Sequence, residues 1–413
     1  MPYVEGFGTW PFGEEWLWEA MATSYLPLLA ALDERPGQVT VSVTPVLADQ
    51  WAVPGIGTRF VEFMRGVREA SHALDLQARP DLAGPLELSL ERYRSAARGY
   101  RDLVAGFAQH ATWTSAATHA VLPLLATDAG VRLQVETGVD AFRARFGAWD
   151  GGFWLPECAH EPWLDARLEA VGVRVCCVEL TDLGIARGPL RTAAGPVLVP
   201  IDRSVIDLVW GRDGYPSGAA YLATHNYTPR EHLAWAVDGS LYDPDRAAEQ
   251  VRVDAADFVA RVAAGDGLCV CAIDTELLGH WWVEGVDWLA AVLDECARVG
   301  LEVAPLTADV ETVDCPPLPA TSWGQPRDLS TWSGPAARGL AWRARRAELA
   351  VLKQQSPNAR QVRELLALQS SDWAFLVSRD TAGPYPLERF AAHERNLYAP
   401  PSDPAVRGLA PFV

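Results

Sequence analysis

The segment GGFWLPECAH, residues 151–160, carries a short apolar run that ends at Pro156 and the acidic residue Glu157. The ring of Pro156 fixes the backbone where the run ends. A second segment, LCVCAIDTELLGHWW at 268–282, repeats this design, with Asp274 closing its apolar run. Unbroken hydrophobicity, without alternation, is typical of parallel strands buried on both faces. The two segments therefore predict a parallel sheet with a carboxylate at each of two strand ends.

Similar apolar runs recur along the chain and alternate with amphipathic segments. The predicted strands are 39–45, 110–115, 152–155, 173–178, 205–210, 268–273 and 302–305. The predicted helices are 14–33, 57–76, 87–109, 135–146, 161–171, 245–264 and 285–299. Alternating strands and helices predict a parallel α/β sheet, and this number of units favours a closed barrel.

The 413 residues exceed what one core usually supports, so we expect a large domain and a smaller one. Residues 1–310 are predicted to form the catalytic barrel, with a helical insertion at about 47–109, where no strand pattern occurs. A Pro-, Gly- and Ser-rich stretch at 312–337 predicts a long loop, and helical patterns follow at 338–355 and 358–378. We therefore expect a C-terminal helical domain at 311–413 that contributes aromatic residues to the cleft.

The net charge of −18 argues against nucleic acid or an anionic membrane as a partner. It is compatible with a neutral substrate such as a glucan, and equally with simple solubility. Seven cysteines without a CxxC pair favour reduced thiols over a zinc site. The sequence shows no signal peptide and no apolar run of the ~20 residues that span a membrane, so we expect a cytoplasmic protein.

In a parallel barrel the carboxyl ends of the strands form the face that carries the chemistry. An acid at a strand end is more often a cap than a catalyst. Here both Glu157 and Asp274 stand among Trp and His residues, and paired carboxylates of this kind break glycosidic bonds. The chain also holds 17 Trp, several in stretches without periodicity, where stacking on a sugar explains them better than core packing. The sequence neighbours of the two acids are Trp154, His160, Glu276, His280, Trp281, Trp282 and Glu284. The tryptophans in stretches without periodicity are Trp210, Trp323, Trp332 and Trp373.

Other chemistries fit the sequence less well. DTELLGH resembles a spaced Asp/His ligand set, but no HExxH or second His pair completes a metal shell. No GxSxG elbow indicates a serine nucleophile. We therefore predict no metal and no cofactor, while a metal-dependent deacetylase or mannosidase and a catalytically dead glucan-binding protein remain alternatives.

Five motifs together resemble glycoside hydrolase family 57, and more closely its 1,4-α-glucan branching enzymes. They are ATHAVLPLL (117–125), WLPECAH (154–160), IDTELLGHWWVEG (273–285), SWG (322–324) and LQSSDW (368–373). The resemblance runs from Met1 to about residue 396, and the second and third motifs are highly specific. It implies a (β/α)7 barrel with an inserted helical subdomain, a C-terminal helical domain, and retaining cleavage without a metal.

The resemblance also implies roles for individual residues. Glu157 matches the family's nucleophile and Asp274 its general acid/base. The implied substrate-binding residues are His119, Trp154, Tyr215, Trp235, His280, Trp282, Trp323, Trp332 and Asp372. The implied reaction cleaves an α-1,4 glucan and transfers it to a C6 hydroxyl, forming an α-1,6 branch; α-amylase and 4-α-glucanotransferase are the alternatives within the family. We expect an α-glucan as the substrate and a monomer or homodimer.

Two departures from the family pattern affect these expectations. The family's first strand reads His-x-His-x-Pro-Tyr, whereas this chain starts at Met1-Pro2-Tyr3, so residues 1–413 are expected to form a barrel lacking its first strand. The family's branching members carry a tyrosine on a mobile loop over the site. Residues 211–221 keep Tyr215 and Tyr221, but the segment before Trp235 is shorter than usual.

Overall fold

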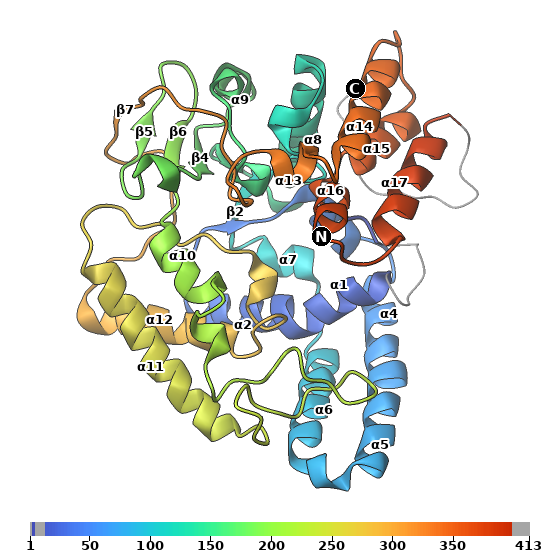
Figure 1. The fold of residues 1–413 in the computed structure, drawn as a ribbon, viewed down its shortest axis with the longest axis vertical. Coiled ribbons are helices and arrows are strands. Elements are labelled where there is room, and N and C mark those ends of the chain that lie inside the picture. Colours follow the sequence, from blue (N-terminus) through green and yellow to red (C-terminus); the bar gives the residue numbers. More distant parts are fainter. Residues whose placement is uncertain (1, 5–12, 399–413) are drawn as a thin grey trace.

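A twisted, largely parallel sheet organises the protein, whose computed structural model describes residues 2–4 and 13–398 (Figure 1). In chain order the strands are β1 (Val41–Ser42), β2 (Ala111–Ser115), β3 (Gly152–Trp154), β4 (Val175–Val178), β5 (Leu190–Arg191), β6 (Val197–Pro200) and β7 (Val313–Asp314). They lie in the order β1-β2-β3-β4-β6-β5-β7. β1, β2, β3, β4 and β6 are mutually parallel, whereas β5 forms an antiparallel pair with β6.

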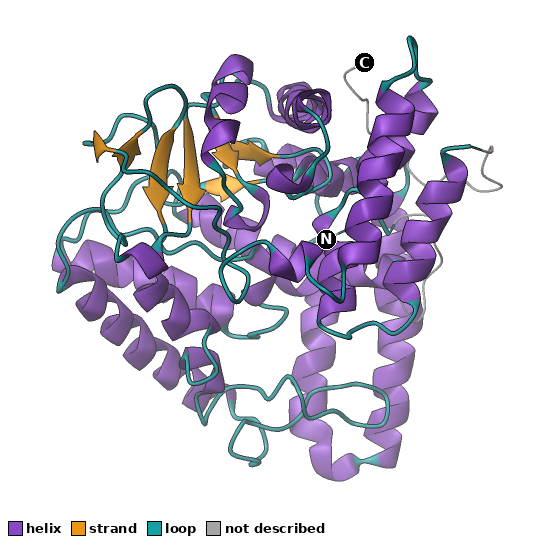
Figure 2. Ribbon diagram, turned by 45° about the horizontal axis from the view of Figure 1, so that its top comes forward, coloured by secondary structure: helices purple, strands orange, loops and turns teal. Residues whose placement is uncertain are grey.

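Helices connect the parallel strands and cover the sheet (Figure 2). The barrel helices are α1 (Glu14–Ala20), α2 (Leu26–Glu34), α3 (Pro45–Trp51), α8 (Asp128–Phe146), α9 (Asp165–Val171), α10 (Arg203–Trp210), α11 (Pro244–Ala263) and α12 (Gly285–Val299). Helix α8 packs very closely on β2, because a Cβ on Gly138 would lie 2.2 Å from the carbonyl oxygen of Ser115. All four residues of β4 are buried, as expected for a strand covered on both faces.

The stretch between β1 and β2 forms a helical insertion, seen as the long hairpin at the lower right of Figure 1. It contains α4 (Ile56–Phe63), the π-helical turn η2 (Met64–Arg68), α5 (Glu69–Ala78), α6 (Ala83–Arg98) and α7 (Leu103–Phe107). The loop at 219–243 crosses this hairpin and is fastened to it, since Asp75 binds both Thr228 and Arg230.

Three of the predicted strands are wrong. Residues 205–210 form helix α10, because Asp202 caps its N-terminus and the buried residues Val205, Ile206 and Val209 recur at helical spacing. Residues 268–273 and 302–305 are extended but form no ladder. Strands β5, β6 and β7 were not predicted.

The two extended segments nevertheless stand beside the sheet. The N–H of Asp202, just after β6, donates to the carbonyl of Val270 over 2.9 Å. Leu306 accepts from the indole of Trp113 in β2 over 3.1 Å and donates to Thr40 Oγ1 over 2.7 Å. The chain thus returns towards β1 and β2 after passing β6. This arrangement is consistent with a (β/α)7 barrel whose last two strands are held by isolated hydrogen bonds and not by a regular ladder.

A group of C-terminal helices packs against α8 at the upper right of Figure 1. Its members are α13 (Ser330–Ser333), α14 (Arg338–Leu352), α15 (Ala359–Leu368), α16 (Ser371–Ser378) and α17 (Tyr385–Asn396). The buried Glu348 of α14 fastens the group, because it accepts from Thr127 Oγ1 over 2.6 Å and from the N–H of Ala126 over 3.0 Å. The part of the predicted C-terminal domain beyond residue 398 lies outside the described residues. Among the described helices, none has the length and apolar character to cross a membrane.

Candidate active site

Glu157 stands directly after β3 in an unusual backbone conformation. It belongs to the single turn η5 (Pro156–Cys158), and both Glu157 and Cys158 have positive φ, at 62° and 48°. Residues other than glycine seldom occupy this left-handed region, and such strain gathers at functional sites. The turn is held by the N–H of Cys158, which donates to Leu155, and by the N–H of Trp323, which donates to the carbonyl of Glu157 over 2.9 Å.

Three side chains surround the Glu157 carboxylate. The indole Nε1 of Trp323 donates to Oε2 over 2.7 Å, and the Ser371 hydroxyl, which contacts His119, acts on the same carboxylate and lowers its pKa. His119 Nδ1 lies 3.8 Å from Oε1. The pKa of Glu157 is raised to about 7, mainly by burial and also by the negative charges of Asp274 and Asp372, against the lowering effects of Trp323 and Ser371.

Asp274 occupies the end of the extended segment 268–273, where it leads into the turn η9 (Thr275–Leu277). It retains exposed surface, yet the protein around it removes enough water to raise its pKa to about 7. The charges of Glu276 and Asp372 act in the same direction. The charge of Asp274 in turn raises the pKa of Glu157, so the ionisation of Glu157 depends on that of Asp274. Such a pair can supply one acid and one nucleophile.

The turn that carries Asp274 rests on the π-helical turn η1 (Met21–Tyr25), which joins α1 to α2. Ser24 Oγ donates to the carbonyl of Thr275 over 2.9 Å, and the Tyr25 hydroxyl donates to Glu276. Gly279 makes the close approach possible: its φ is 93°, and a Cβ there would lie 1.9 Å from the Thr23 carbonyl oxygen. Single π-turns within helices are frequent at functional sites. Here the π-turn buttresses the acid-bearing loop.

The two predicted histidines come from different parts of the chain and contact different partners. His119, just after β2, has φ of 58°, and burial lowers its pKa to about 4. Its Nδ1 lies 2.8 Å from Ser371 Oγ. His280 follows η9, and its Nδ1 lies 3.3 Å from Thr23 Oγ1. Burial also lowers the pKa of His280, so both rings favour the neutral form.

The structure brings most of the predicted residues together. Trp154 meets Trp323 edge to face, with ring centroids 5.1 Å apart, so it lies beside the indole that binds Glu157. The charge of Asp372, at the start of α16, acts on Glu157, Asp274 and His119. These side chains come from the turn after β2, from β3 and the turn after it, from the end of the 268–274 segment, from the loop before α13, and from the start of α16.

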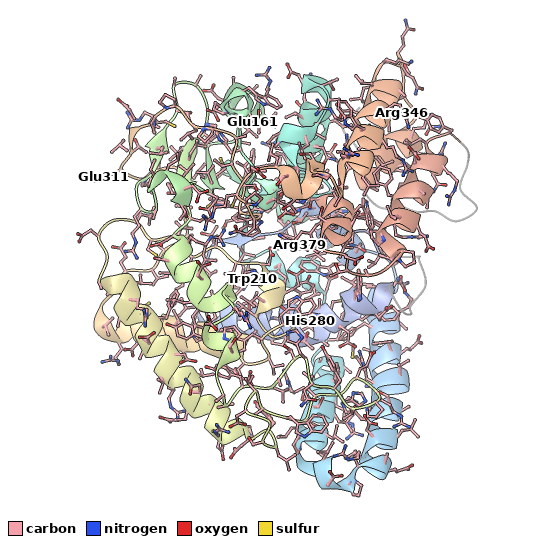
Figure 3. All side chains as sticks on the ribbon, viewed as in Figure 1. Glu161, Trp210, His280, Glu311, Arg346 and Arg379 are labelled. Atoms are coloured by element: carbon pink, nitrogen blue, oxygen red, sulfur yellow. The ribbon has the colours of Figure 1, made fainter. Side chains whose placement is uncertain are left out.

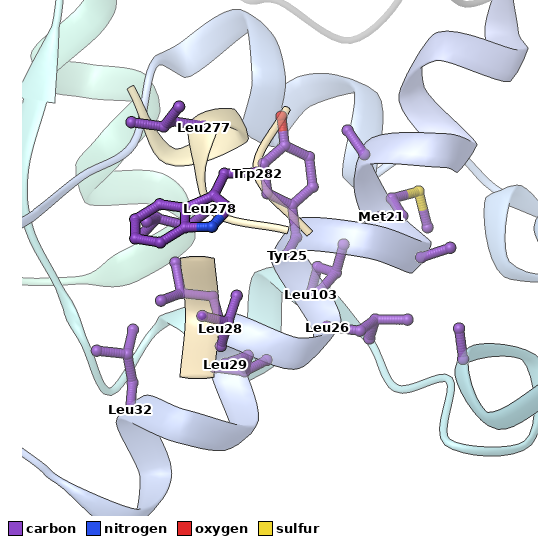
Figure 4. Close-up of a cluster of buried hydrophobic side chains, with 14 of the residues drawn as sticks. Met21, Tyr25, Leu26, Leu28, Leu29, Leu32, Leu103, Leu277, Leu278 and Trp282 are labelled. Carbon is purple, nitrogen blue, oxygen red and sulfur yellow. The ribbon is translucent and has the colours of Figure 1, made fainter. Parts of the chain in front are cut away.

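Four of the predicted substrate-binding residues lie elsewhere or are covered. Trp282 and Trp332 are 1% and 2% exposed, so neither ring offers a face to a sugar, contrary to expectation. Figure 4 shows Trp282 among Leu277, Leu278 and other apolar side chains of the largest core cluster.

Tyr215 and Trp235 also depart from the expected position. The Tyr215 hydroxyl donates to Asp257 of α11 over 2.7 Å. The Arg79 guanidinium lies over the Trp235 ring, 5.8 Å from the centroid of that ring. Among the described residues, the contacts of both run to α11, α12 and the insertion, and none reaches Glu157 or Asp274.

Sequence reasoning missed two residues. Ser371 was passed over in favour of its neighbour Asp372, although serine at the start of a helix is free to bond outward. Trp281 was noted but not chosen, and it is the exposed member of the tryptophan pair, at 52%. It stands edge to face with His280, at 4.9 Å between centroids, and Figure 3 marks His280 near the middle of the molecule. Within the described parts of the chain, no group of three or more His, Cys, Asp or Glu side chains is placed to hold a metal ion.

Two family models match most of the chain. The family model for glycosyl hydrolase family 57 matches residues 1–311, and the model for the C-terminal part of 1,4-alpha-glucan branching enzymes matches residues 342–399. The 1,4-alpha-glucan branching enzyme TK1436 of Thermococcus kodakarensis is 29% identical over 486 residues, covering 96% of this chain and 71% of that protein.

Solved structures extend the likeness. That same enzyme, crystallised with glucose, has a TM-score of 0.88 at 29% identity, covering 96% of this chain and 88% of that one. The branching enzyme from Pyrococcus horikoshii has a TM-score of 0.87 at 29% identity, covering 96% and 87%. The alpha-amylase AmyC from Thermotoga maritima, at 22% identity and a TM-score of 0.81 over 96% and 90% of the two chains, shares the fold.

Proposed function

The chain belongs to glycosyl hydrolase family 57, and from that premise we propose that it is a 1,4-α-glucan branching enzyme. One observation carries the proposal beyond the family. The C-terminal part, which matches the branching-enzyme model over 342–399, places Ser371 2.8 Å from His119, whose ring lies 3.8 Å from the Glu157 carboxylate. The region that matches the branching-enzyme model therefore contacts a histidine beside the carboxylate on which the chemistry depends.

In the proposed reaction Glu157 attacks the anomeric carbon of an α-1,4-linked glucan while Asp274 protonates the departing O4. A glucosyl ester on Glu157 results, and the cut chain leaves with a free O4 hydroxyl. Asp274, now a carboxylate, then takes the proton of an incoming C6 hydroxyl, whose oxygen displaces Glu157. The raised pKa of Asp274, about 7, supports its protonated role, and the hydrogen bond from Trp323 to the Glu157 carboxylate supports the ionised role of Glu157.

We assign substrate contacts to residues near this pair that keep accessible surface. Trp154 and Trp323 form one aromatic corner beside Glu157, and Trp281 offers an exposed ring beside His280. His119 and Asp372 are placed to bond sugar hydroxyls. We assign no substrate contact to Trp282 and Trp332, because both side chains are buried.

The alternatives, α-amylase and 4-α-glucanotransferase, differ only in what attacks the intermediate: water, or an O4 hydroxyl. Products separate the three. After incubation with amylose and enzymatic debranching, a branching enzyme yields short linear chains released from new α-1,6 points. A rise in reducing ends before debranching, without new branches, would instead indicate hydrolysis, and a redistribution of linear lengths would indicate disproportionation. Glu157→Gln serves as the inactive control.

A further inference from the structure

Two consecutive serines at the start of α16 bind different partners. Ser370 Oγ donates to Asp372 Oδ2 over 2.8 Å, which keeps that contact within the helix start. Ser371 reaches across to the barrel instead. It is 3% exposed, its Oγ lies 2.8 Å from His119 Nδ1, and its backbone N–H donates to the carbonyl of His119 over 3.1 Å. The same His119 Nδ1 lies 3.8 Å from Glu157 Oε1, so the hydroxyl stands beside the carboxylate, whose pKa it lowers.

A hydroxyl placed between an imidazole and a carboxylate has one arrangement that satisfies both bonds. An ionised carboxylate only accepts, so the hydroxyl proton must point to Glu157. The serine oxygen must then accept from the ring, which places the ring proton on Nδ1 of His119. Its other nitrogen, Nε2, is left as an acceptor. The His119 side chain keeps 19% of its surface exposed, so the ring is not sealed off.

We propose that Ser371 is a positioning residue that orients the Glu157 carboxylate and fixes His119 as its Nδ1–H tautomer, so that Nε2 accepts from a sugar hydroxyl. This rests on the proposed function, in which Glu157 is the nucleophile. Because Ser371 belongs to α16, the packing of the C-terminal helices determines the orientation of the Glu157 carboxylate. It also determines which nitrogen of His119 carries the proton.

The test compares Ser371→Ala with Ser371→Thr, which keeps the hydroxyl. Ser378→Ala is the matched control, because Ser378 stands at the other end of α16 and donates to the backbone carbonyl of Thr331. The first readout is kcat/KM on amylose as a function of pH. The groups whose charge faces Glu157 are Asp274, Asp372 and His119, and all remain in these variants.

We expect Ser371→Ala to lose about tenfold or more in kcat/KM, since hydrogen bonds to charged groups are among the stronger ones. Its acid limb should move to higher pH, because Ser371 lowers the pKa of Glu157. Ser371→Thr should restore both properties, and Ser378→Ala should keep them. The second readout is nitrogen-15 NMR of the His119 ring, assigned by its loss in His119→Gln, which should show Nδ1–H in the wild type.

An unmoved acid limb in folded Ser371→Ala, or an Nε2–H ring in the wild type, would overturn the proposal. The NMR measurement on the wild type decides the matter even if Ser371→Ala fails to fold. The Glu157→Gln variant distinguishes a failure of the proposed function from a failure of the role proposed for Ser371. Full activity in that variant would refute the proposed function itself, whereas an inactive Glu157→Gln with an unaffected Ser371→Ala would refute only the role of Ser371.

Discussion

Trp323 binds Glu157 twice: its indole Nε1 donates to Oε2 over 2.7 Å, and its backbone N–H donates to the carbonyl over 2.9 Å. The loop that leads into the C-terminal helices is thus joined to the turn after β3 at the proposed nucleophile. Activity therefore depends on this loop being in place, and single substitutions can test the dependence.

Replacing Trp323 with phenylalanine removes the donor but keeps an aromatic ring. We expect kcat/KM on amylose to fall by about 10- to 100-fold, the worth of a hydrogen bond to a charged group. Trp332→Phe is the control, because the Nε1 of Trp332 is buried without a partner among the described residues. Equal losses in the two variants would show that ring packing, and not the bond to Glu157, matters.

The raised pKa of Glu157 has a consequence for stability. A carboxyl whose pKa rises on folding, here from 4.5 to about 7, stabilises the fold below pH 4.5, and that contribution is lost as the pH rises through 7. Glu157→Gln should therefore unfold at higher temperature than the wild type above pH 7, by about 1 to 3 kcal/mol in free energy. The two proteins should converge in acid.

Glu394→Gln is the opposite control for that measurement. The Arg343 guanidinium lowers the pKa of Glu394, so its charge stabilises the fold above its unfolded pKa. Thermal scans at several pH values should show this variant destabilised at neutral pH. A Glu157→Gln variant that also loses stability there would contradict the account of a strained, desolvated nucleophile.

The two adjacent tryptophans after His280 should behave differently. Trp281 is 52% exposed, so Trp281→Ala should leave the melting temperature nearly unchanged and raise KM for amylose about two- to tenfold. Trp282 packs against Tyr221 and Trp288, so Trp282→Ala should cost about 3–5 kcal/mol of stability. The assignment of Trp281 to the substrate would fail if its alanine variant kept the wild-type KM.

The attachment of the 219–243 loop to the insertion should weaken in acid. His72 and His232 stack with ring centroids 3.5 Å apart, and burial lowers the pKa of both, that of His232 to about 4. The unfolded loop then binds more protons than the folded one between pH 6.5 and 4, so stability falls as the pH falls through that window. Asp75, Arg68 and Arg94 are the other charges that act on His72.

Limited proteolysis across this pH range measures the effect, since cleavage within the loop should increase as the pH falls. His232→Phe should remove most of the dependence, and His225→Phe, an exposed position in the same loop, should not. Identical profiles for the two variants would exclude the stacked pair as the cause.

The fold and site were predictable to the extent that local pattern determines them. The apolar run before Glu157 formed β3, and the resemblance in WLPECAH and DTELLGHWW pointed to the carboxylates that the structure couples. Residues 205–210 show why pattern alone fails. VIDLVW has the composition of a strand, but the Asp202 cap and the spacing of its buried residues make it α10.

The remaining site residues depend on contacts between distant parts of the chain. Whether Trp281 or Trp282 is buried follows from how the Gly279 turn rests on Thr23, and no local rule distinguishes two adjacent tryptophans. Ser371 meets His119 across 252 positions of sequence, so only the packing of α16 against the end of β2 reveals it.

The central claim is that Glu157 forms a covalent bond with the sugar. Incubation with 5-fluoro-α-D-glucosyl fluoride, followed by peptide mass spectrometry, tests this claim most directly. The fluorine at C5 slows hydrolysis of the glycosyl ester, so the ester accumulates on the enzyme. We predict one label, on Glu157, that is absent in Glu157→Gln. A label on a different carboxylate, or turnover that inverts the anomeric configuration, would contradict the account.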